Sequence, residues 1–185
     1  MEVTAPPATT EPTDLDLISH WRNGDPRAAT RLVERHATAL ARFVASVGGR
    51  EAADELVQDT FVRAFGAIDS FRGESSFRTW LFTIARRLVL DRRRSERRSR
   101  IVGSVEEDDV VTSSDPLDAI VADESMGRVR AAVGRLSPRQ REVFVLRVEQ
   151  GLSYREIADL IGSTEGATRV HYHNAMRVVK ECLNE

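Results

Sequence analysis

The sequence predicts an all-α fold with two small helical domains joined by a flexible acidic linker. Apolar residues recur every three or four positions from Asp14 almost to the C-terminal end, which is the period of a helix. No stretch of useful length alternates between apolar and polar residues as a strand does. Between residues 99 and 119 the composition shifts to Ser, Gly, Asp and Glu, and Asp115-Pro116 is a helix breaker, so this segment is expected to be the linker.

The N-terminal domain is expected to span residues 14–98, after a flexible tail over residues 1–13 that contains three prolines and several threonines. In its first helix, Leu15, Ile18 and Trp21 recur at helical spacing. A proline at the first position and a glycine pair at the end delimit the second helix. The four expected helices begin near Asp14, Pro26, Glu51 and Ser75 or Ser76, and the third ends near Ile68.

The C-terminal domain is expected to span residues 120–185 and to end in a helix-turn-helix. Helical periodicity returns near Leu117. Its later helices are expected over residues 139–150, 154–161 and from about 165 to 183, with Ser137 and Ser153 as caps of the first two. Gly162 permits the left-handed conformation that a tight turn between two helices requires.

The last helix is expected to separate an inward from an outward face. The inward side chains are Thr168, Tyr172, Ala175, Met176 and Val179. The outward side chains are Glu165, Arg169, Val170, His173 and Asn174. Such an outward set can donate and accept hydrogen bonds along base edges in a DNA major groove, and Arg169 can also reach a phosphate. The spacing fits an ordinary α-hairpin with a solvated face equally well.

The formal net charge of −2 conceals two opposite blocks of charge. Residues 84–100 contain eight arginines and two acidic residues, whereas residues 104–124 contain eight acidic residues and no basic one. A dense run of arginines on one helix can neutralise several phosphates. The acidic block could fold back and mask the arginines, and unchanged DNA affinity at low salt after deletion of residues 104–115 would contradict that hypothesis. The acidic segment could also be a plain flexible spacer.

The composition argues against several other classes of protein. No phosphate-binding glycine loop and no catalytic Cys or Ser constellation is visible, so neither an enzyme nor a cofactor is expected. The four histidines lack metal-ligand partners at usable spacing, and Cys182, the only cysteine, can form neither an internal disulfide nor a cysteine-based zinc site. No apolar run is long enough to span a membrane and the N-terminal residues do not form a signal peptide, so a soluble cytoplasmic protein is expected.

Three motifs resemble those of sigma factors. Residues 54–65 (DELVQDTFVRAF) resemble the helix that binds core RNA polymerase, and residues 71–86 (FRGESSFRTWLFTIAR) resemble the segment that opens and reads the promoter −10 element. The C-terminal motif, over residues 136–144, 151–158 and 162–169, resembles the domain that reads the −35 element, a pattern shared with LuxR-type regulators. Because a LuxR-type regulator would lack the N-terminal motifs, the chain is identified as a member of the extracytoplasmic-function (ECF) class of the sigma-70 family.

The resemblance implies three binding surfaces, with residues 14–98 as sigma region 2 and residues 120–185 as sigma region 4. The residues implied in binding core polymerase are Asp54, Glu55, Gln58, Asp59, Phe61 and Arg63. Those implied at −10 DNA are Phe71, Ser75, Ser76, Phe77, Arg86, Arg87, Arg93 and Arg94. Those implied at −35 DNA are Ser153, Tyr154, Arg155, Thr164, Glu165, Arg169, His173 and Asn174. Phe77 and Trp80 could instead belong to the core, which is the favoured reading for Trp80.

The implied partners are RNA polymerase core, through its β and β′ subunits, promoter DNA, and an anti-sigma factor. The chain departs from the family at Arg87, where Asn is common, and at Val170 and His171, where Ser and Arg are common. The alternative function is a helix-turn-helix transcriptional regulator that is not a polymerase subunit. Co-purification with core polymerase, followed by run-off transcription, separates the two functions.

Overall fold

The computed structural model describes residues 11–102 and 124–184, and every regular element in these ranges is a helix, as predicted. The helices are α1 (Asp14–Arg22), α2 (Pro26–Gly48), α3 (Ala53–Gly66), the 3-10 helix η1 (Ile68–Ser70), α4 (Phe77–Val102), α5 (Glu124–Gly134), α6 (Pro138–Val148), α7 (Tyr154–Ile161) and α8 (Glu165–Asn184). None of these helices is long and apolar enough to cross a lipid bilayer. Most of the expected tail and linker lies outside the described residues.

Local sequence signals determine where several helices begin and end. Ser137 and Ser153 cap α6 and α7, as predicted, each in a reciprocal capping box with the residue three positions later. Ser76, rather than Ser75, caps α4, because its hydroxyl oxygen accepts the backbone N–H three positions later at 3.0 Å. Gly162 ends α7 with φ of +66°, in the left-handed conformation that its position in the turn predicted.

Three features differ from the sequence expectation. Helix α3 ends at Gly66, before Ile68, because the chain turns there into η1. Helix α4 continues through Val102, past residue 98, because no glycine or proline interrupts it before Gly103. In α1, Leu17 faces the core and Leu15 is 61% exposed, because α1 docks on α2 through its other side.

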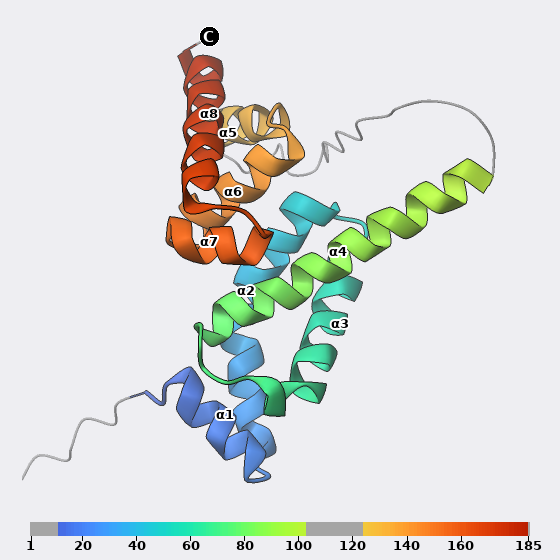
Figure 1. The fold of residues 1–185 in the computed structure, drawn as a ribbon, viewed down its shortest axis with the longest axis vertical. Helices are drawn as coiled ribbons and strands as arrows, with labels where there is room; N and C mark the ends of the chain where they lie inside the picture. The colour runs from blue at the N-terminus through green and yellow to red at the C-terminus, as the bar shows by residue number, and fades with distance from the viewer. Residues whose placement is uncertain (1–10, 103–123, 185) are drawn as a thin grey trace, which may run out of the picture.

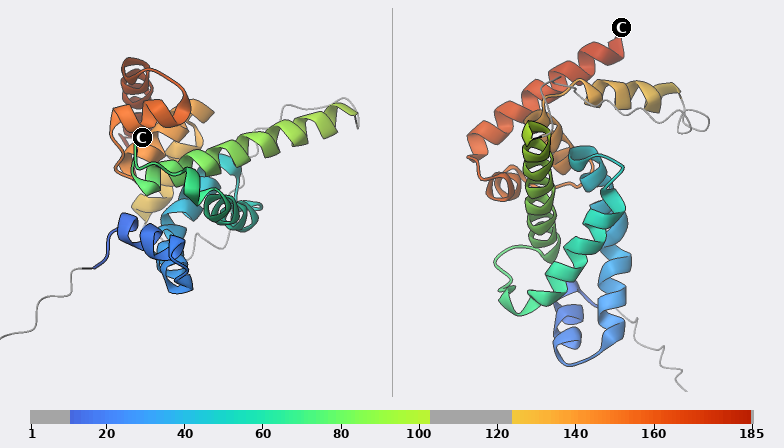
Figure 2. Two further views of the ribbon diagram at one scale, coloured as in Figure 1. Left: turned by 60° about the horizontal axis from the view of Figure 1, so that its bottom comes forward. Right: turned by 90° about the vertical axis from the view of Figure 1, so that its right-hand side faces the viewer.

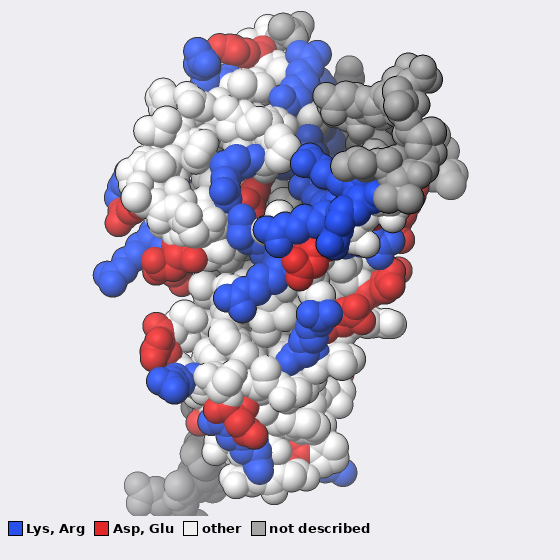
Figure 3. All heavy atoms as spheres, turned by 45° about the vertical axis from the view of Figure 1, so that its right-hand side comes forward, with Lys and Arg blue, Asp and Glu red and all other residues white. Residues whose placement is uncertain are grey.

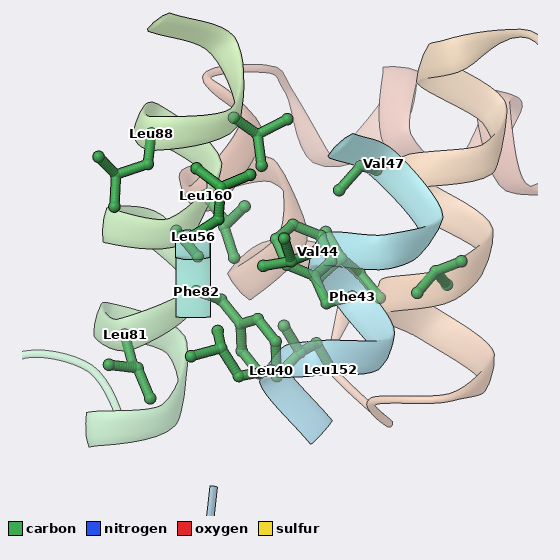
Figure 4. Close-up of a cluster of buried hydrophobic side chains, with 14 of the residues drawn as sticks. Leu40, Phe43, Val44, Val47, Leu56, Leu81, Phe82, Leu88, Leu152 and Leu160 are labelled. Atoms are coloured by element: carbon green, nitrogen blue, oxygen red, sulfur yellow. The ribbon is translucent and has the colours of Figure 1, made fainter. Parts of the chain in front are cut away.

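Helix α2 lies at the centre of the N-terminal lobe, which consists of α1 to α4. Its residues Leu40, Phe43 and Val44 pack against α3 and α4 (Figure 4). The rings of Phe43 and Phe82 meet edge to face with centroids 5.0 Å apart, an arrangement that aromatic pairs favour. Burial of each such side chain stabilises the fold by about 1.5–3 kcal/mol, so α2 and α4 are held together chiefly by apolar contact.

The C-terminal lobe consists of α5 to α8, with α8 packed against the other three helices. Thr168, Ala175 and Val179 of α8 are buried, as expected of the inward face, and Tyr172 and Met176 are half-buried. Figure 2 shows α5 and α8 side by side at the end of the molecule remote from α1.

The two lobes pack directly against each other. Helix α6 lies on α2, and α7 lies on α4 (Figure 1). Leu152 and Leu160 of the C-terminal lobe belong to the same buried cluster as Phe43 and Phe82 of the N-terminal lobe (Figure 4). The described residues therefore share one continuous apolar core across the two lobes.

Candidate nucleic-acid interface

The residues of α3 expected to bind core polymerase are exposed, except Phe61. Its exposed side chains are Asp54, Glu55, Gln58, Asp59 and Arg63. Val62 lies among them and is 71% exposed, so an apolar group is available on the same surface. Glu55 forms an ion pair with Arg92 of α4, with 2.7 Å between the carboxylate and the guanidinium. This face therefore combines acidic, amide and apolar groups that are accessible to a partner.

Phe61, expected to bind polymerase, lies on the opposite side of α3. It is 7% exposed, and its ring stacks on that of Phe65 at 6.1 Å. The helical period explains this position, since residues 56, 60, 61 and 64 all face α2 and α4. Phe61 supports the exposed face from inside the lobe and does not form part of it.

Phe71 and Phe77, expected to hold unpaired bases, are buried within the N-terminal lobe. Their rings lie 5.8 Å apart, edge to face, and both pack against Trp80. Phe71 lies in the loop of residues 71–76, between η1 and α4. Arg22 of α1 donates to the backbone carbonyls of Ile68 and Phe71 at 2.6 and 3.1 Å, which ties η1 and the start of this loop to α1. These two phenylalanines therefore hold the loop in place and offer no free ring face to a base.

Three neighbours of this aromatic cluster are more accessible. Ser75 and Ser76 are exposed, whereas Trp80, expected in the core, is only half-buried at the rim of the cluster. The described structure thus leaves Trp80 as the aromatic side chain of this segment that could reach a ligand.

The arginines of α4 differ in accessibility. Arg87 and Arg94 are exposed and Arg93 is half-buried, and in Figure 3 basic side chains gather in a band across the middle of the molecule. Arg86 is different, because its Nε donates to Glu142 of α6 at 2.5 Å and its side chain is only 16% exposed. Arg86 is therefore unavailable to DNA while the lobes are packed together.

Further polar contacts join the lobes around this ion pair. Arg78 donates to the side-chain oxygen of Gln150 at 2.5 Å, and Gln150 donates in turn to the carbonyl of Ala39 at 3.4 Å. Thr79 donates to a carboxylate oxygen of Glu156 at 3.3 Å. No local sequence signal marks Arg78, Glu142 or Gln150, because their partners lie 56 to 111 residues away along the chain.

A hollow of about 340 Å³ opens beside these contacts. Its walls include Ser75 and Thr79 of the N-terminal lobe and Arg155, Glu156 and Asp159 of α7. Ser75 was expected at −10 DNA and Arg155 at −35 DNA, yet here they line one hollow. The closed arrangement thus places parts of both expected DNA surfaces opposite each other.

In the helix-turn-helix, most of the residues expected at −35 DNA are exposed, and two of them cap the starts of α7 and α8. Those that are exposed are Ser153, Arg155, Thr164, Glu165, Arg169 and His173, and those that are half-buried are Tyr154 and Asn174. The hydroxyl of Ser153 accepts the backbone N–H of Glu156 at 3.2 Å, and that of Thr164 accepts the N–H of Ala167 at 3.2 Å. Both hydroxyl oxygens therefore stabilise the starts of α7 and α8.

Two charged residues of the motif are held by neighbours. Arg169 pairs with Glu165 one turn earlier at 2.6 Å, and its guanidinium lies over the ring of Tyr154. Glu156 accepts the backbone N–H of Ser153 at 2.8 Å. The hydrogen bond from the Ser153 backbone lowers the pKa of the Glu156 carboxyl below its ordinary value, and the interaction with the Ser153 hydroxyl lowers it further.

Family models match both lobes. The sigma-70 region 2 model matches residues 32–99, and the sigma-70 region 4 model matches residues 126–178. The first match covers α3 and most of the arginine-rich α4, and the second covers the helix-turn-helix.

Relatives match over most of the chain. The ECF RNA polymerase sigma factor BldN of Streptomyces coelicolor is 33% identical over 91% of this chain, which spans 65% of BldN's own length. The RNA polymerase sigma factor CnrH of Cupriavidus metallidurans is 34% identical over 82% of this chain and 84% of its own length.

Two solved structures are also similar in fold. CnrH in complex with the cytosolic domain of CnrY is 29% identical, with a TM-score of 0.68 over 92% of this chain and 97% of CnrH. The sigma factor RpoE of Bartonella quintana, in complex with the anti-sigma factor NepR, is 26% identical, with a TM-score of 0.69 over 84% of this chain and 96% of RpoE.

Proposed function

This chain belongs to the extracytoplasmic-function RNA polymerase sigma factors of the sigma-70 family, and we propose that its two lobes divide promoter recognition between them. As a sigma factor it binds RNA polymerase core and directs the initiation of transcription. The region 2 match in the N-terminal lobe disfavours a helix-turn-helix regulator outside polymerase, since such a regulator needs only the C-terminal lobe. Its site of action is proposed to be the cytoplasm, where RNA polymerase works.

The exposed face of α3 is the proposed docking surface for core polymerase. It consists of Asp54, Glu55, Gln58, Asp59, Val62 and Arg63. The single observation that carries this proposal is the exposure of Val62 among acidic and amide side chains, because a stable docking surface combines an apolar centre with a polar rim.

Charge reversal on this face tests the proposal. Asp59→Arg should weaken binding to core polymerase at least tenfold, because an acidic surface that meets a basic partner loses its complementarity. Binding to labelled core polymerase, by fluorescence anisotropy, measures the effect. Glu34→Arg makes the same charge change at an exposed position of α2 and serves as the control. Equal affinity of both variants would contradict the assignment of α3.

The N-terminal lobe is proposed to engage −10 DNA through its loop and through α4. Ser75, Ser76 and the accessible edge of Trp80 would contact unpaired bases by hydrogen bonding and stacking. Arg87, Arg93 and Arg94 would contact phosphates, which makes binding dependent on salt. Phe71 and Phe77 would act by fixing the loop from inside.

The C-terminal lobe is proposed to engage −35 DNA through α7 and α8. Glu165, Arg169 and His173 lie on the exposed stripe of α8 and would enter the major groove. Arg155 and the start of α7 would contact the backbone, while Ser153 and Thr164 keep the two helix starts in place.

Promoter binding would require the lobes to separate. The −10 and −35 elements are about 25 base pairs apart, which is roughly 85 Å along B-DNA at about 3.4 Å per base pair. In the described structure the hydroxyl of Thr79, from the N-terminal lobe, lies 3.3 Å from a carboxylate oxygen of Glu156, from the C-terminal lobe. The packed arrangement is therefore proposed to be the form that does not bind a whole promoter.

An anti-sigma factor is the proposed partner of the packed form. The solved structures of CnrH with the cytosolic domain of CnrY and of RpoE with the anti-sigma factor NepR match this chain over both lobes. A protein of that class would hold this chain away from polymerase.

The function is tested by reconstitution. The purified full chain should co-purify with core polymerase and support run-off transcription from a promoter selected from a random library. If the chain failed to bind core polymerase but still bound duplex DNA, the sigma-factor function would be refuted. The alternative, a helix-turn-helix regulator that is not a polymerase subunit, would then be favoured.

A further inference from the structure

The ring of Tyr154, the first residue of α7, makes cation–π contacts with guanidinium groups from two other helices. The guanidinium carbon of Arg147, from α6, lies 4.7 Å from the ring centroid, and that of Arg169, from α8, lies 4.6 Å from it. The ring of Tyr172, also from α8, meets it at 5.7 Å, edge to face. Two helices of this lobe, α6 and α8, thus converge on one aromatic side chain of a third, α7.

Each arginine has a second anchor. Arg147 donates to the backbone carbonyl of Leu152 at 2.8 Å, which ties it to the turn between α6 and α7. Arg169 donates to the Glu165 carboxylate at 2.6 Å, one turn earlier on α8. The Arg169 guanidinium is therefore held from one side by the ring and from another by the carboxylate, although its side chain is 60% exposed.

This arrangement gives Arg169 an orientation before any DNA is present. An exposed arginine normally samples many rotamers, and binding must then immobilise it. A cation–π contact uses the face of the ring, so the remaining N–H donors of the guanidinium stay available for a planar, bidentate acceptor. Guanine presents such an acceptor pair in the major groove. Arg169, Tyr172 and His173 also line an open hollow of about 460 Å³ with Tyr154, at the surface proposed to face DNA.

We propose that Tyr154 is a positioning residue for −35 recognition, which fixes Arg169 in the orientation that reads a base pair. The proposal rests on the proposed −35 role of α8. In this mechanism Arg147 holds the ring, the ring holds Arg169, and Glu165 sets the direction of the guanidinium. The carboxylate of Glu165 offsets the charge of Arg169. Arg169 is therefore expected to add more to base-pair specificity, through the orientation of its N–H donors, than to the general attraction of phosphate.

The mechanism separates base reading from backbone contact. Loss of a base-reading arginine relaxes preference at one position, whereas loss of a phosphate contact weakens binding to all sequences and reduces the salt slope by about one. A direct phosphate contact by the Tyr154 hydroxyl would belong to the second kind. Tyr154→Phe keeps the ring and removes the hydroxyl, whereas Tyr154→Leu removes the ring.

The experiment uses holoenzyme assembled from core polymerase and the full chain. A selected promoter and duplexes with each −35 base pair substituted in turn are compared for the wild type, Tyr154→Phe, Tyr154→Leu, Arg169→Ala and the double variant Tyr154→Leu/Arg169→Ala. Arg169→Ala should lose discrimination at one base pair by roughly 5- to 150-fold. Tyr154→Leu should lose most of the same discrimination, the double variant should lose no more than Arg169→Ala, and Tyr154→Phe should behave as the wild type.

A second measurement remains decisive if Tyr154→Leu weakens the fold. In the full chain without DNA, NMR should show the Arg169 side-chain protons displaced by the ring current in the wild type and in Tyr154→Phe, but not in Tyr154→Leu. A uniform loss of affinity in Tyr154→Leu with discrimination retained, an equal loss in Tyr154→Phe, or no ring-current displacement would overturn the positioning role. If Arg169→Ala changes no base preference, the proposed −35 role of Arg169 fails as well, which distinguishes the two failures.

Discussion

Ser153 and Glu156 define the start of α7 at the scale of single residues. The two residues exchange hydrogen bonds between side chain and backbone at 3.2 and 2.8 Å. Helix α7 has only eight residues, so its first turn is a large part of it. Arg155 projects from this turn and is exposed, so the cap also determines where that side chain points.

Removal of the Ser153 hydroxyl should destabilise the protein by about 1 kcal/mol, the usual effect of losing a helix cap. Ser153→Ala should therefore lower the urea midpoint measured by far-UV circular dichroism. Ser153→Asp keeps a capping oxygen and should unfold at nearly the wild-type midpoint. Equal destabilisation by both substitutions would show that the cap is not the cause.

The lowered pKa of Glu156 predicts a pH dependence of stability. Its backbone bond to Ser153 favours the ionised carboxyl in the folded state, so the folded pKa lies below the ordinary value of 4.5. The corresponding stability is present above pH 4.5 and is lost as the pH falls through the folded pKa. The difference in unfolding free energy between the wild type and Glu156→Gln should therefore shrink on acidification from pH 6 to pH 3.

Chemical denaturation at each pH measures that difference. In a Ser153→Ala background the same Glu156→Gln substitution should have a smaller pH effect, because one of the bonds that lower the pKa is already absent. A difference that stays constant from pH 6 to pH 3 would exclude this role for the Glu156 carboxylate.

At the scale of elements, the turn between α7 and α8 depends on the backbone of one residue. Gly162 has φ of +66°, and a Cβ built there would have no atom within 4 Å. The restriction on this position is therefore conformational and not due to crowding. Gly166, in the first turn of α8, has equally open space around it but no left-handed φ.

This contrast gives a matched pair of substitutions. Gly162→Ala should destabilise the protein by about 1–2 kcal/mol, the energy of forcing an L-residue into the left-handed conformation. Gly166→Ala should stabilise it by about 0.5–1 kcal/mol, because alanine loses less conformational entropy in a helix. Denaturation midpoints of the two variants should therefore move in opposite directions, and a shift in the same direction would refute the backbone explanation.

For the molecule as a whole, the packing of the lobes opposes DNA binding. The Arg86–Glu142 ion pair is nearly buried, with the side chains 16% and 11% exposed, and Arg139 bonds the other oxygen of Glu142 at 3.2 Å. Burial of this pair separates Arg86 from the exposed arginines of α4, such as Arg87 and Arg94. A state that binds DNA must therefore first break this contact, and affinity falls with the fraction of open molecules.

Weakening the ion pair should favour the open state. Glu142→Gln should raise the affinity of the free chain for promoter DNA at least tenfold at low salt, since loss of one partner of a buried charge pair typically has an effect of about 2–5 kcal/mol and about 1.4 kcal/mol corresponds to tenfold. Fluorescence anisotropy without polymerase measures the affinity, and small-angle X-ray scattering should show a larger radius of gyration.

Arg139→Gln is the matched control for this prediction. It removes the partner of Glu142 within the C-terminal lobe and leaves the Arg86 contact in place. If Glu142→Gln matches the wild type in both affinity and radius, the ion pair does not hold the lobes together.

The sequence by itself determined the all-helical fold, several helix caps and most of the helix faces. The caps Ser137 and Ser153, the turn at Gly162 and the exposed face of α3 are local features, because each depends on residues within one or two helical turns. The motifs of residues 54–65 and 71–86 indicated the family for the same reason, since each lies in one continuous segment.

Only the tertiary structure decided which side chains of those motifs are accessible. Phe71 and Phe77 are buried and Trp80 is half-buried, because their exposure depends on how the loop packs against α1 and α2. Arg86 is removed from the basic surface by Glu142, 56 residues away. No local pattern specifies such a pairing, because its two partners lie in different lobes. The lobes are brought together by the free energy of burying apolar surface between segments that are distant in the sequence.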